Sequence, residues 1–394
     1  MTDPRGPVTV VRCEWVVTVD DDDRVLDVEG TEGLDSPPAF PELGVYTLPG
    51  RVADPRPAIE DARQAEAAGL GSVWISERPD VKEAATLSGA VGAVTSRSAV
   101  AVGVTNPHTR HLMMTAAYAS TMAELTEGRF MLGLGRGIDL RWNVWNVPPV
   151  TGALLADTVT LLRRLWAGEP VVGHEGPAGT FPYLSLDHTV GHPVPVGLAA
   201  LGPRTQELGG THFDVVLLHS HWTDQAVAEC VTRVRGAAER AGRDPDAVQV
   251  WSCLVSACEL PEDDELRHVV RRMTTYLQVP GYGELIVSAN GWDPAVLDRV
   301  RSHPLLEGRL ADATEFTTDE LRTLRDLYPE EWLSSSNAVG SAEHCARRVR
   351  DQFDAGAAGV VLHGSSPAEL HPLLDAWRSV RPAHLATRSP VPGR

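Results

Sequence analysis

The sequence predicts an α/β protein built as a (β/α)8 TIM barrel, with an N-terminal β-hairpin extension and a helical insertion. From Leu43 onward the chain repeats one unit, a short apolar run rich in β-branched residues, a turn and an amphipathic helical stretch. This pattern is typical of parallel strands joined by crossover helices. Eight such runs occur, and eight strands close a TIM barrel. A length of 394 residues with 43% hydrophobic content provides a barrel core and leaves room for an accessory segment.

The eight expected strands are apolar runs bounded by turn residues. They span residues 43–48, 72–76, 99–104, 130–134, 194–199, 214–218, 248–255 and 359–363. The helix expected at 55–68 ends at Gly69, and the one at 343–355 ends at Gly356, as helices with a C-terminal glycine do. The first and last units therefore place loops at the carboxyl ends of strands, where barrel enzymes assemble their sites.

Three segments depart from this repeat. Residues 1–40 hold a strand-like stretch (8–19), an acidic turn (20–23), a second strand (24–28) and a linker, which we interpret as a β-hairpin extension with a solvated turn. Residues 41–394 form the barrel. Within it, residues 167–193 are rich in Gly, Pro and His and form a long excursion after the fourth strand. Residues from about 260 to 335 form the largest insertion, which is mostly helical, and long insertions of this kind usually shape a pocket or an interface.

Composition excludes several classes of partner. The chain has 35 basic and 53 acidic side chains, a formal net charge of -18, so we expect neither a nucleic acid nor an anionic membrane as partner. No run approaches the ~18 apolar residues of a membrane span, and the first residues do not read as a signal peptide, which favours a cytoplasmic protein with a small-molecule substrate. The five cysteines lack a CxxC spacing, so we expect reduced, buried thiols.

The most informative stretch contains two neighbouring strand ends. The strand at 99–104 ends in Gly103-Val104 and gives way to the polar loop 105–111, while the next strand ends in the alternating glycines of residues 133–137. Glycines at adjacent strand ends let a flat ligand approach the backbone closely. The pattern indicates a binding site at this edge of the barrel.

At this point the chain resembles the luciferase-like flavin and deazaflavin oxidoreductases. The matching motifs occur in the family's order across most of residues 43–365. They are Leu43-Gly44-Val45-Tyr46, Ala65-Glu66-Ala67-Ala68-Gly69-Leu70, Val73-Trp74-Ile75-Ser76, Gly103-Val104-Thr105-Asn106-Pro107, residues 128–135 and Ala199-Ala200-Leu201-Gly202-Pro203. So many motifs in the same order are an improbable accident.

The resemblance implies a barrel mouth that holds either FMN or coenzyme F420, a deazaflavin hydride carrier, and the sequence is more similar to the F420-dependent branch. It implies a non-prolyl cis peptide at Gly103-Val104, forming a bulge behind the ring. It also implies that Glu77 faces the hydroxylated edge of the ring and that Asn106 contacts its polar edge. Arg78 stands where relatives often carry histidine, which is a departure at the proton-transfer position.

The resemblance further implies that the phosphate end of the cofactor lies at Ala200, Leu201 and Gly202. Pro203 opens a helix there, and the free amides of a helix start beside Arg204 suit an anion. Arg136 and Gly137 lie at the tip of the fourth strand, where Arg136 could meet an anionic group. Relatives that oxidise sugars carry an acid just beyond this tip, whereas this chain has Ile138 before Asp139, so sugar dehydrogenation is not expected.

Histidines gather at the expected strand ends, at His108, His111, His219, His221 and His363. The pairs 108/111 and 219/221 invite a metal site, but no acidic ligand accompanies them in a known pattern. Since histidine titrates near neutrality, we expect His108 or His221 to serve as the acid or base toward the substrate. Trp142, Trp145 and Trp222 could wall the cleft.

These residues together predict an F420-dependent oxidoreductase that moves hydride between the deazaflavin and a small organic substrate, assembled as a homodimer. One alternative is an FMN-dependent monooxygenase of the same family, which uses oxygen. A second is a metal-dependent hydrolase using the clustered histidines, and a third is a barrel that binds a ligand without turnover.

Overall fold

The computed structural model describes residues 8–12, 15–19, 25–30, 36–137 and 139–394. The chain divides into two compact units, Met1–Pro37 and Pro38–Arg394. The first unit is an antiparallel sheet of three strands in the order β1 (Val8–Arg12), β2 (Trp15–Val19), β3 (Val25–Gly30). The stretch expected as one strand at 8–19 is thus two strands. The expected acidic turn at 20–23 lies outside the described residues.

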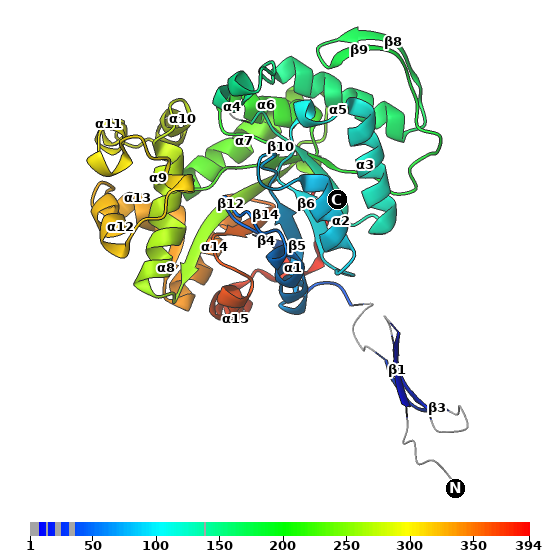
Figure 1. Cartoon of the computed structure of the whole chain (residues 1–394), viewed down its shortest axis with the longest axis horizontal. Helices are drawn as coiled ribbons and strands as arrows, with labels where there is room; N and C mark the ends of the chain where they lie inside the picture. Colours follow the sequence, from blue (N-terminus) through cyan, green and yellow to red (C-terminus); the bar gives the residue numbers. More distant parts are fainter. Residues whose placement is uncertain (1–7, 13–14, 20–24, 31–35, 138) are drawn as a thin grey trace. The chain divides into compact units, whose positions relative to one another are not determined.

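The second unit contains a closed barrel of eight parallel strands, as predicted (Figure 1). Around the barrel the strands are β4 (Phe40–Tyr46), β5 (Leu70–Ile75), β6 (Ala99–Val102), β7 (Phe130–Leu134), β10 (Val196–Ala199), β11 (Val215–Leu217), β12 (Gln249–Cys258) and β14 (Gly359–His363). Leu362 of β14 pairs with Val45 of β4 and closes the ring. The third strand stops at Val102, two residues earlier than expected, because Gly103 and Val104 leave the ladder.

One further strand, β13 (Asn337–Gly340), was not predicted. It pairs in parallel with the last residues of β12, from Val255 to Cys258, beyond the point where β11 has ended. The ten-residue β12 therefore pairs first with β11 and then, further along, with β13. The ring of eight strands is unchanged, and the insertion returns to the barrel through β13.

Helices cover the outside of the barrel. They are α1 (Pro57–Ala67), α2 (Ala84–Gly92), α3 (Leu112–Leu125), α4 (Asp139–Val144), α5 (Gly152–Trp166), α6 (Pro203–His212), α7 (Asp224–Arg240), α14 (Ala342–Asp354) and α15 (His371–Val380). Gly69 follows α1 at φ 82° and Gly356 follows α14 at φ 98°, a left-handed conformation that favours glycine. The residues between α5 and β10 form a hairpin of β8 (Val171–Gly176) and β9 (Gly179–Leu184), seen at the top of Figure 1.

The barrel has two hydrophobic layers because side chains alternate along each strand. Outward residues such as Val45, Val73 and Leu132 pack beneath the helices. The interior is filled by bulky side chains, with the rings of Trp74 and Trp251 5.4 Å apart. These rings fill the middle of the barrel, beneath the carboxyl ends of the strands.

The insertion forms a helical lobe on one side of the barrel (Figure 1). Its helices are α8 (Glu262–Leu266), α9 (Arg272–Leu277), α10 (Tyr282–Ala289), α11 (Ala295–Arg301), α12 (Thr318–Arg325) and α13 (Glu330–Ser336), and a π-helical turn (Arg267–Arg271) joins the first two. The lobe has its own apolar core. Trp292 and Trp332 stack within it at a centroid distance of 4.3 Å and an interplanar angle of 9°.

Candidate active site

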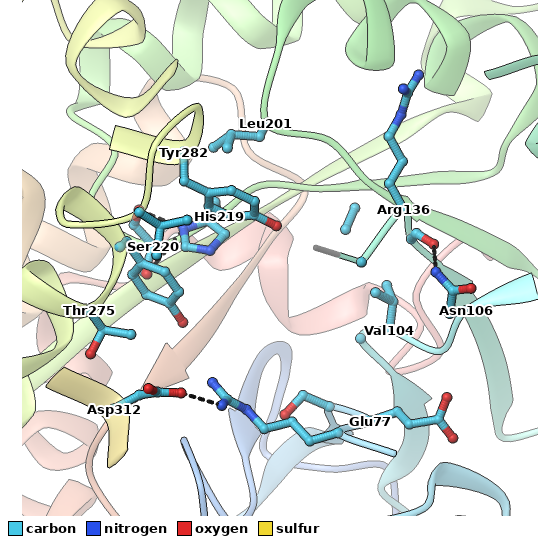
Figure 2. A pocket seen from close by; sticks show the side chains of 18 of the residues that line it. Glu77, Val104, Asn106, Arg136, Leu201, His219, Ser220, Thr275, Tyr282 and Asp312 are labelled. Atoms are coloured by element: carbon cyan, nitrogen blue, oxygen red, sulfur yellow. Dashed lines mark hydrogen bonds and ion pairs between the residues drawn. The ribbon is translucent and has the colours of Figure 1, made fainter. Parts of the chain in front are cut away.

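A cavity of about 1200 Å³ opens at the carboxyl ends of the barrel strands. Its walls come from the strand ends and from α9 and α10 of the insertion. Among the residues expected at the site, the ones that line it are Glu77, Gly103, Val104, Asn106, Arg136, Gly137, Ala200, Leu201, Gly202 and Arg204. Figure 2 shows Val104 between the insertion side, with His219 and Tyr282, and the Asn106 side.

The bulge after β6 has the cis Gly103–Val104 peptide bond that the resemblance implied. The Tyr46 hydroxyl donates to the Gly103 carbonyl at 2.6 Å from inside the barrel. The next residue, Thr105, is held by β7, since its amide donates to the Gly133 carbonyl and its carbonyl accepts from the Gly135 amide, both at 2.9 Å. A Cβ on Gly135 would lie 2.4 Å from Val104 Cγ2. Glycine at this position therefore makes space for the Val104 side chain.

Asn106 anchors the loop that follows the bulge. Its amide nitrogen donates to the Gly135 carbonyl at 2.9 Å, and its amide oxygen accepts from the His108 backbone at 2.9 Å. Only 7% of the residue is exposed. The expected contact with the polar edge of the cofactor stays a prediction. In the structure the side chain joins the loop to the end of β7.

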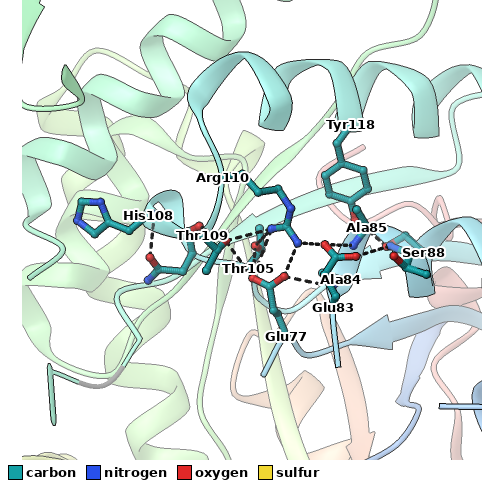
Figure 3. Close-up of polar contacts among 12 residues, drawn as sticks. Glu77, Glu83, Ala84, Ala85, Ser88, Thr105, His108, Thr109, Arg110 and Tyr118 are labelled. Carbon is teal, nitrogen blue, oxygen red and sulfur yellow. Dashed lines mark hydrogen bonds and ion pairs between the residues drawn. The ribbon is translucent and has the colours of Figure 1, made fainter. Parts of the chain in front are cut away.

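Glu77 is bound by protein groups (Figure 3). The carboxylate forms an ion pair with Arg110 and accepts hydrogen bonds from Thr105 Oγ1 at 2.6 Å and the Ala84 amide at 3.1 Å. Its side chain is 2% exposed. Burial raises the pKa of Glu77, but the bonds from Arg110 and Thr105 lower it more, so the pKa is below its usual value. A buried carboxylate with these donors stays ionised and fixes the bulge loop to the start of α2.

The start of α6 forms the next part of the wall. Gly202 is its N-cap in extended conformation, Pro203 is its first residue, and no side chain caps it. Leu201 and Gly202 are half-buried, whereas the neighbouring Arg204 is exposed. This is a helix start with its positive end facing a cavity.

His219, at the end of β11, lines the cavity, whereas neither His108 nor His221 is among the described residues that do so. His221 is 1% exposed, and its Nδ1 lies 2.8 Å from Asn337 Oδ1. Its backbone has a left-handed φ of 67°, which gives its side chain a direction different from that of His219. Burial, with help from His219 and Arg272, lowers its pKa to about 3. The structure therefore does not place these two histidines on the cavity wall, and their part in proton transfer stays a prediction.

His108 follows Asn106 on the outer side of the loop, and its ring extends away from Glu77 and Arg110 in Figure 3. His219, in contrast, packs edge-on against Tyr276 at a centroid distance of 4.1 Å and against Tyr282 at 5.7 Å. Burial lowers the pKa of His219 to about 4. The imidazole facing the cavity is therefore neutral at physiological pH.

A family model decides the relationship of the chain. The model described as luciferase-like monooxygenase matches residues 38–359. The chain belongs to the luciferase-like monooxygenase family. It is an oxidoreductase of that family, on the expected fold.

Individual relatives and solved structures agree with this family assignment. The chain is 25% identical over 307 residues to a 5,10-methylenetetrahydromethanopterin reductase from Methanolobus tindarius, covering 76% of this chain and 87% of that protein. Its fold matches the coenzyme F420-dependent tetrahydromethanopterin reductase of Methanopyrus kandleri with a TM-score of 0.70 at 16% identity, covering 86% of this chain and 99% of that one. The oxygenating component of 3,6-diketocamphane monooxygenase from Pseudomonas putida, solved with FMN, matches with a TM-score of 0.60 at 17% identity over 89% and 98% of the two chains.

Sequence reasoning about this luciferase-like chain missed the residues of the insertion that line the cavity. The cavity wall formed by Arg272, Tyr276 and Tyr282 comes from the insertion, which carries no motif. Trp142 and Trp145 line the cavity, as expected, but Trp222 is buried outside it. The pair His219 and His221 drew attention to this strand end, and the structure places His219 of the two on the cavity wall.

The metal-site alternative has no geometric basis in the described part of the chain. No group of three or more His, Cys, Asp or Glu side chains there is placed to hold a metal ion.

Four cysteines, at 230, 253, 258 and 345, are free and buried, and Cys13 lies outside the described residues. Among the helices that the structure describes, none has the length and apolarity to cross a bilayer.

Proposed function

We propose that this luciferase-like enzyme is an F420-dependent oxidoreductase that transfers hydride between the deazaflavin and a small organic substrate. The observation that carries the proposal is the wall around Val104, formed by a bulged strand end and by residues with little or no side chain. The F420-dependent reductase named above has the same fold, which adds support for this cofactor.

The residues around the bulge fit a flat ring. Gly135, after β7, lies against Val104, and Ala199, the last residue of β10, lies beside Gly135. Gly137 and Ala200 line the same cavity. Small side chains leave an apolar surface against which a tricyclic ring can pack. Bound there, the deazaflavin would supply or accept the hydride.

The start of α6 fits the anionic tail of the cofactor. Leu201, Gly202 and Arg204 would bind phosphate through backbone amides and a guanidinium, because a helix N-terminus favours negative charge. Arg136 also lines the cavity, and its side chain extends away from Val104 and His219 in Figure 2. Glu77 acts as a positioning residue in this proposal, since its carboxylate fixes the loop that carries Val104.

His219 replaces His108 and His221 as the group that we propose for proton transfer. Its Nδ1 lies 3.3 Å from the Ser220 carbonyl and 3.4 Å from the Ser220 hydroxyl. In the tautomer that we propose, Nδ1 carries the hydrogen and donates it to the carbonyl. Nε2 then has a free lone pair and can accept a proton from a substrate hydroxyl as hydride leaves the adjoining carbon. Tyr276 and Tyr282 hold the ring from two sides and exclude water from it.

The second candidate is an FMN-dependent monooxygenase. The observation that favours it is the similar fold of the FMN-bound camphane monooxygenase component. The two functions differ in the fate of the reduced cofactor, because reduced flavin reacts with oxygen and reduced F420 does not do so readily.

Turnover under two atmospheres tests the proposal. Protein with reduced F420 and a panel of ketones, imines and enoates should oxidise F420 at equal rates with and without oxygen. With oxidised F420, matching alcohols should reduce it. His219→Asn should lower the rate by about 100-fold or more, whereas His111→Asn, which keeps the cap of α3, should not. Oxygen consumption with reduced FMN and none of these F420 reactions would favour the monooxygenase. Homodimer assembly stays a prediction, to be measured by light scattering.

A further inference from the structure

The charges that line the cavity are mostly compensated. Three acidic residues line it, and each forms an ion pair with an arginine. The pairs are Asp80 with Arg51, Asp312 with Arg78 and Glu77 with Arg110. None of these carboxylates is available to another cation without breaking an existing pair.

Arg272 is the exception on the insertion side. It is the first residue of α9 and lines the cavity, and among the described residues no carboxylate forms an ion pair with it. Within the described part of the chain its side chain has one hydrogen bond, to a neutral acceptor, with Nη1 3.3 Å from His363 Nε2. Its Nε is buried without a partner. Because a guanidinium keeps its charge in proteins, this cation stays charged and incompletely bound.

The surroundings of Arg272 carry the effect of that charge. Burial and then the charge of Arg272 lower the pKa of His363 well below its usual value. The same charge contributes to the lowered pKa of His219, after burial. The mouth of the barrel therefore has a positive pole surrounded by neutral imidazoles.

This pole lies across the mouth from the proposed cofactor seat. Arg272 contacts His363 at the end of β14, and a Cβ on Gly50, after β4, would lie 3.5 Å from its Nη2. In the ring of eight strands β14 is four places from β7, whose tip forms the seat with Val104. His219 follows β11, a strand that lies between them in the ring. The tail of the cofactor has its own helix start at Gly202, so the second pole needs another anion.

A second unsatisfied group lies at the other end of the same helix. Gln278 follows α9 and lines the cavity, and both its amide oxygen and its amide nitrogen are buried without a hydrogen-bond partner in the described chain. Buried polar groups in proteins are normally paired with protein, water or ligand. Arg272 and Gln278 thus point to a polar, anionic ligand group at the insertion wall.

We propose that Arg272 is the substrate-recognition residue of this site and that the substrate is an organic oxyanion. Its carboxylate or phosphate group is bound by the guanidinium of Arg272 and its reacting carbon lies between His219 and the cofactor. This rests on the proposed function for the identity of the reaction, but the anion site itself does not depend on F420. A carboxylate can accept two parallel hydrogen bonds from one guanidinium, which makes arginine selective for such groups.

The test measures anion binding without the cofactor. Full-length protein with labelled histidines is titrated with acetate and, separately, with inorganic phosphate, and the imidazole NMR signals are followed. Saturable shifts of His363 and His219 are expected, and the probe with the lower dissociation constant identifies the preferred oxyanion. Arg272→Gln should weaken binding by about tenfold or more. Arg299→Gln, the same change of charge on the exposed face of the same lobe, should bind as the wild type does.

Two further measurements complete the design. Arg272→Lys keeps the charge but loses the planar fork, so it should bind with intermediate affinity, and it replaces Arg272→Gln where that variant does not fold. F420 is titrated into the same proteins, and its affinity should not change in the Arg272 variants. Absence of saturable shifts in the wild type, equal anion binding by wild type and Arg272→Lys, or weaker F420 binding in the variants would overturn the proposal. Anion binding without any F420 binding would instead refute the proposed function alone.

Discussion

Replacing Gly202 with aspartate should separate folding from cofactor binding. Gly202 has φ −97° and ψ 159° at the N-cap of α6, a conformation that aspartate adopts readily in the same role. A Cβ there would meet only the Leu285 side chain, at 3.4 Å and 3.9 Å, which is ordinary contact. The new carboxylate can accept a hydrogen bond from an amide of the first helical turn. Relative to glycine this changes the free energy of unfolding by only about 0.5 kcal/mol.

The effect on the cofactor should be much larger. The carboxylate of Gly202→Asp would occupy the place proposed for the cofactor phosphate and repel it. For two unit charges about 5 Å apart at an effective dielectric of about 20, the repulsion is about 3 kcal/mol. Gly202 is half-buried and Arg204 is adjacent, so screening reduces this value. We expect F420 to bind about 10- to 100-fold more weakly.

The matched control is Gly202→Ser, which also offers a capping oxygen but carries no charge. Both variants are titrated with F420 while the fluorescence of the deazaflavin is recorded, and their thermal unfolding is compared. Gly202→Ser should stay within about threefold of the wild type in affinity. Equal affinity of the aspartate and serine variants, with both folded, would refute the placement of the phosphate at α6.

Three other substitutions test the support of the site. Gly135→Ala should lower the free energy of unfolding by about 1–3 kcal/mol through its clash with Val104, and adding Val104→Ala should recover part of this loss. Arg110→Met should cost about 3–5 kcal/mol, because it leaves the Glu77 carboxylate buried without its cation; Arg110→Met with Glu77→Gln should be less destabilised, and an equal loss would contradict the pairing. The folded-state pKa of Glu77 is below its usual value. The stability that the ionised Glu77 contributes to the wild type is therefore present above about pH 4.5 and is lost as the pH falls further. Burial lowers the pKa of Lys82 to about 7, so between that pH and 10.5 the ε-amino group is protonated in the unfolded chain but not in the folded one. In this range the free energy of unfolding of the wild type, relative to that of Lys82→Met, should rise with pH by up to about 1.4 kcal/mol per pH unit. A difference in urea unfolding that does not change with pH would contradict the lowered pKa.

The strands and the bulge were predictable because their signals are local. Apolar runs with flanking glycines located all eight barrel strands, and the motif from Gly103 to Asn106 located the bulge. The position of the residue after a strand end also follows from the topology, because all eight ends meet at one edge. The resemblance to the family placed Glu77 and the start of α6 at the cavity, and this topology agrees with it.

The partners of these residues were not predictable from local signals. Glu77 is neutralised by Arg110, 33 residues further along the chain, and only the folded loop brings them together. His219 and His221 both follow the end of β11 closely in the sequence, yet the left-handed backbone of His221 places its ring against Asn337. A choice between them requires the backbone angle.

The insertion wall was hidden for a different reason. The π-helical turn at Arg267–Arg271 shifts the helical register just before Arg272. A period of 3.6 residues across this segment therefore does not show which side chains of α9 face the cavity. Arg272 and Tyr276 become recognisable as site residues only when the lobe is placed beside the barrel.

The seat for a deazaflavin at the Val104 bulge is tested most directly by equilibrium titration of the purified protein with F420 and with FMN, using absorbance and fluorescence to detect each bound form. We predict saturable binding of one F420 per chain and binding of FMN that is weaker by about tenfold or more. Tighter binding of FMN than of F420, or no binding of either, would contradict this assignment of the cofactor.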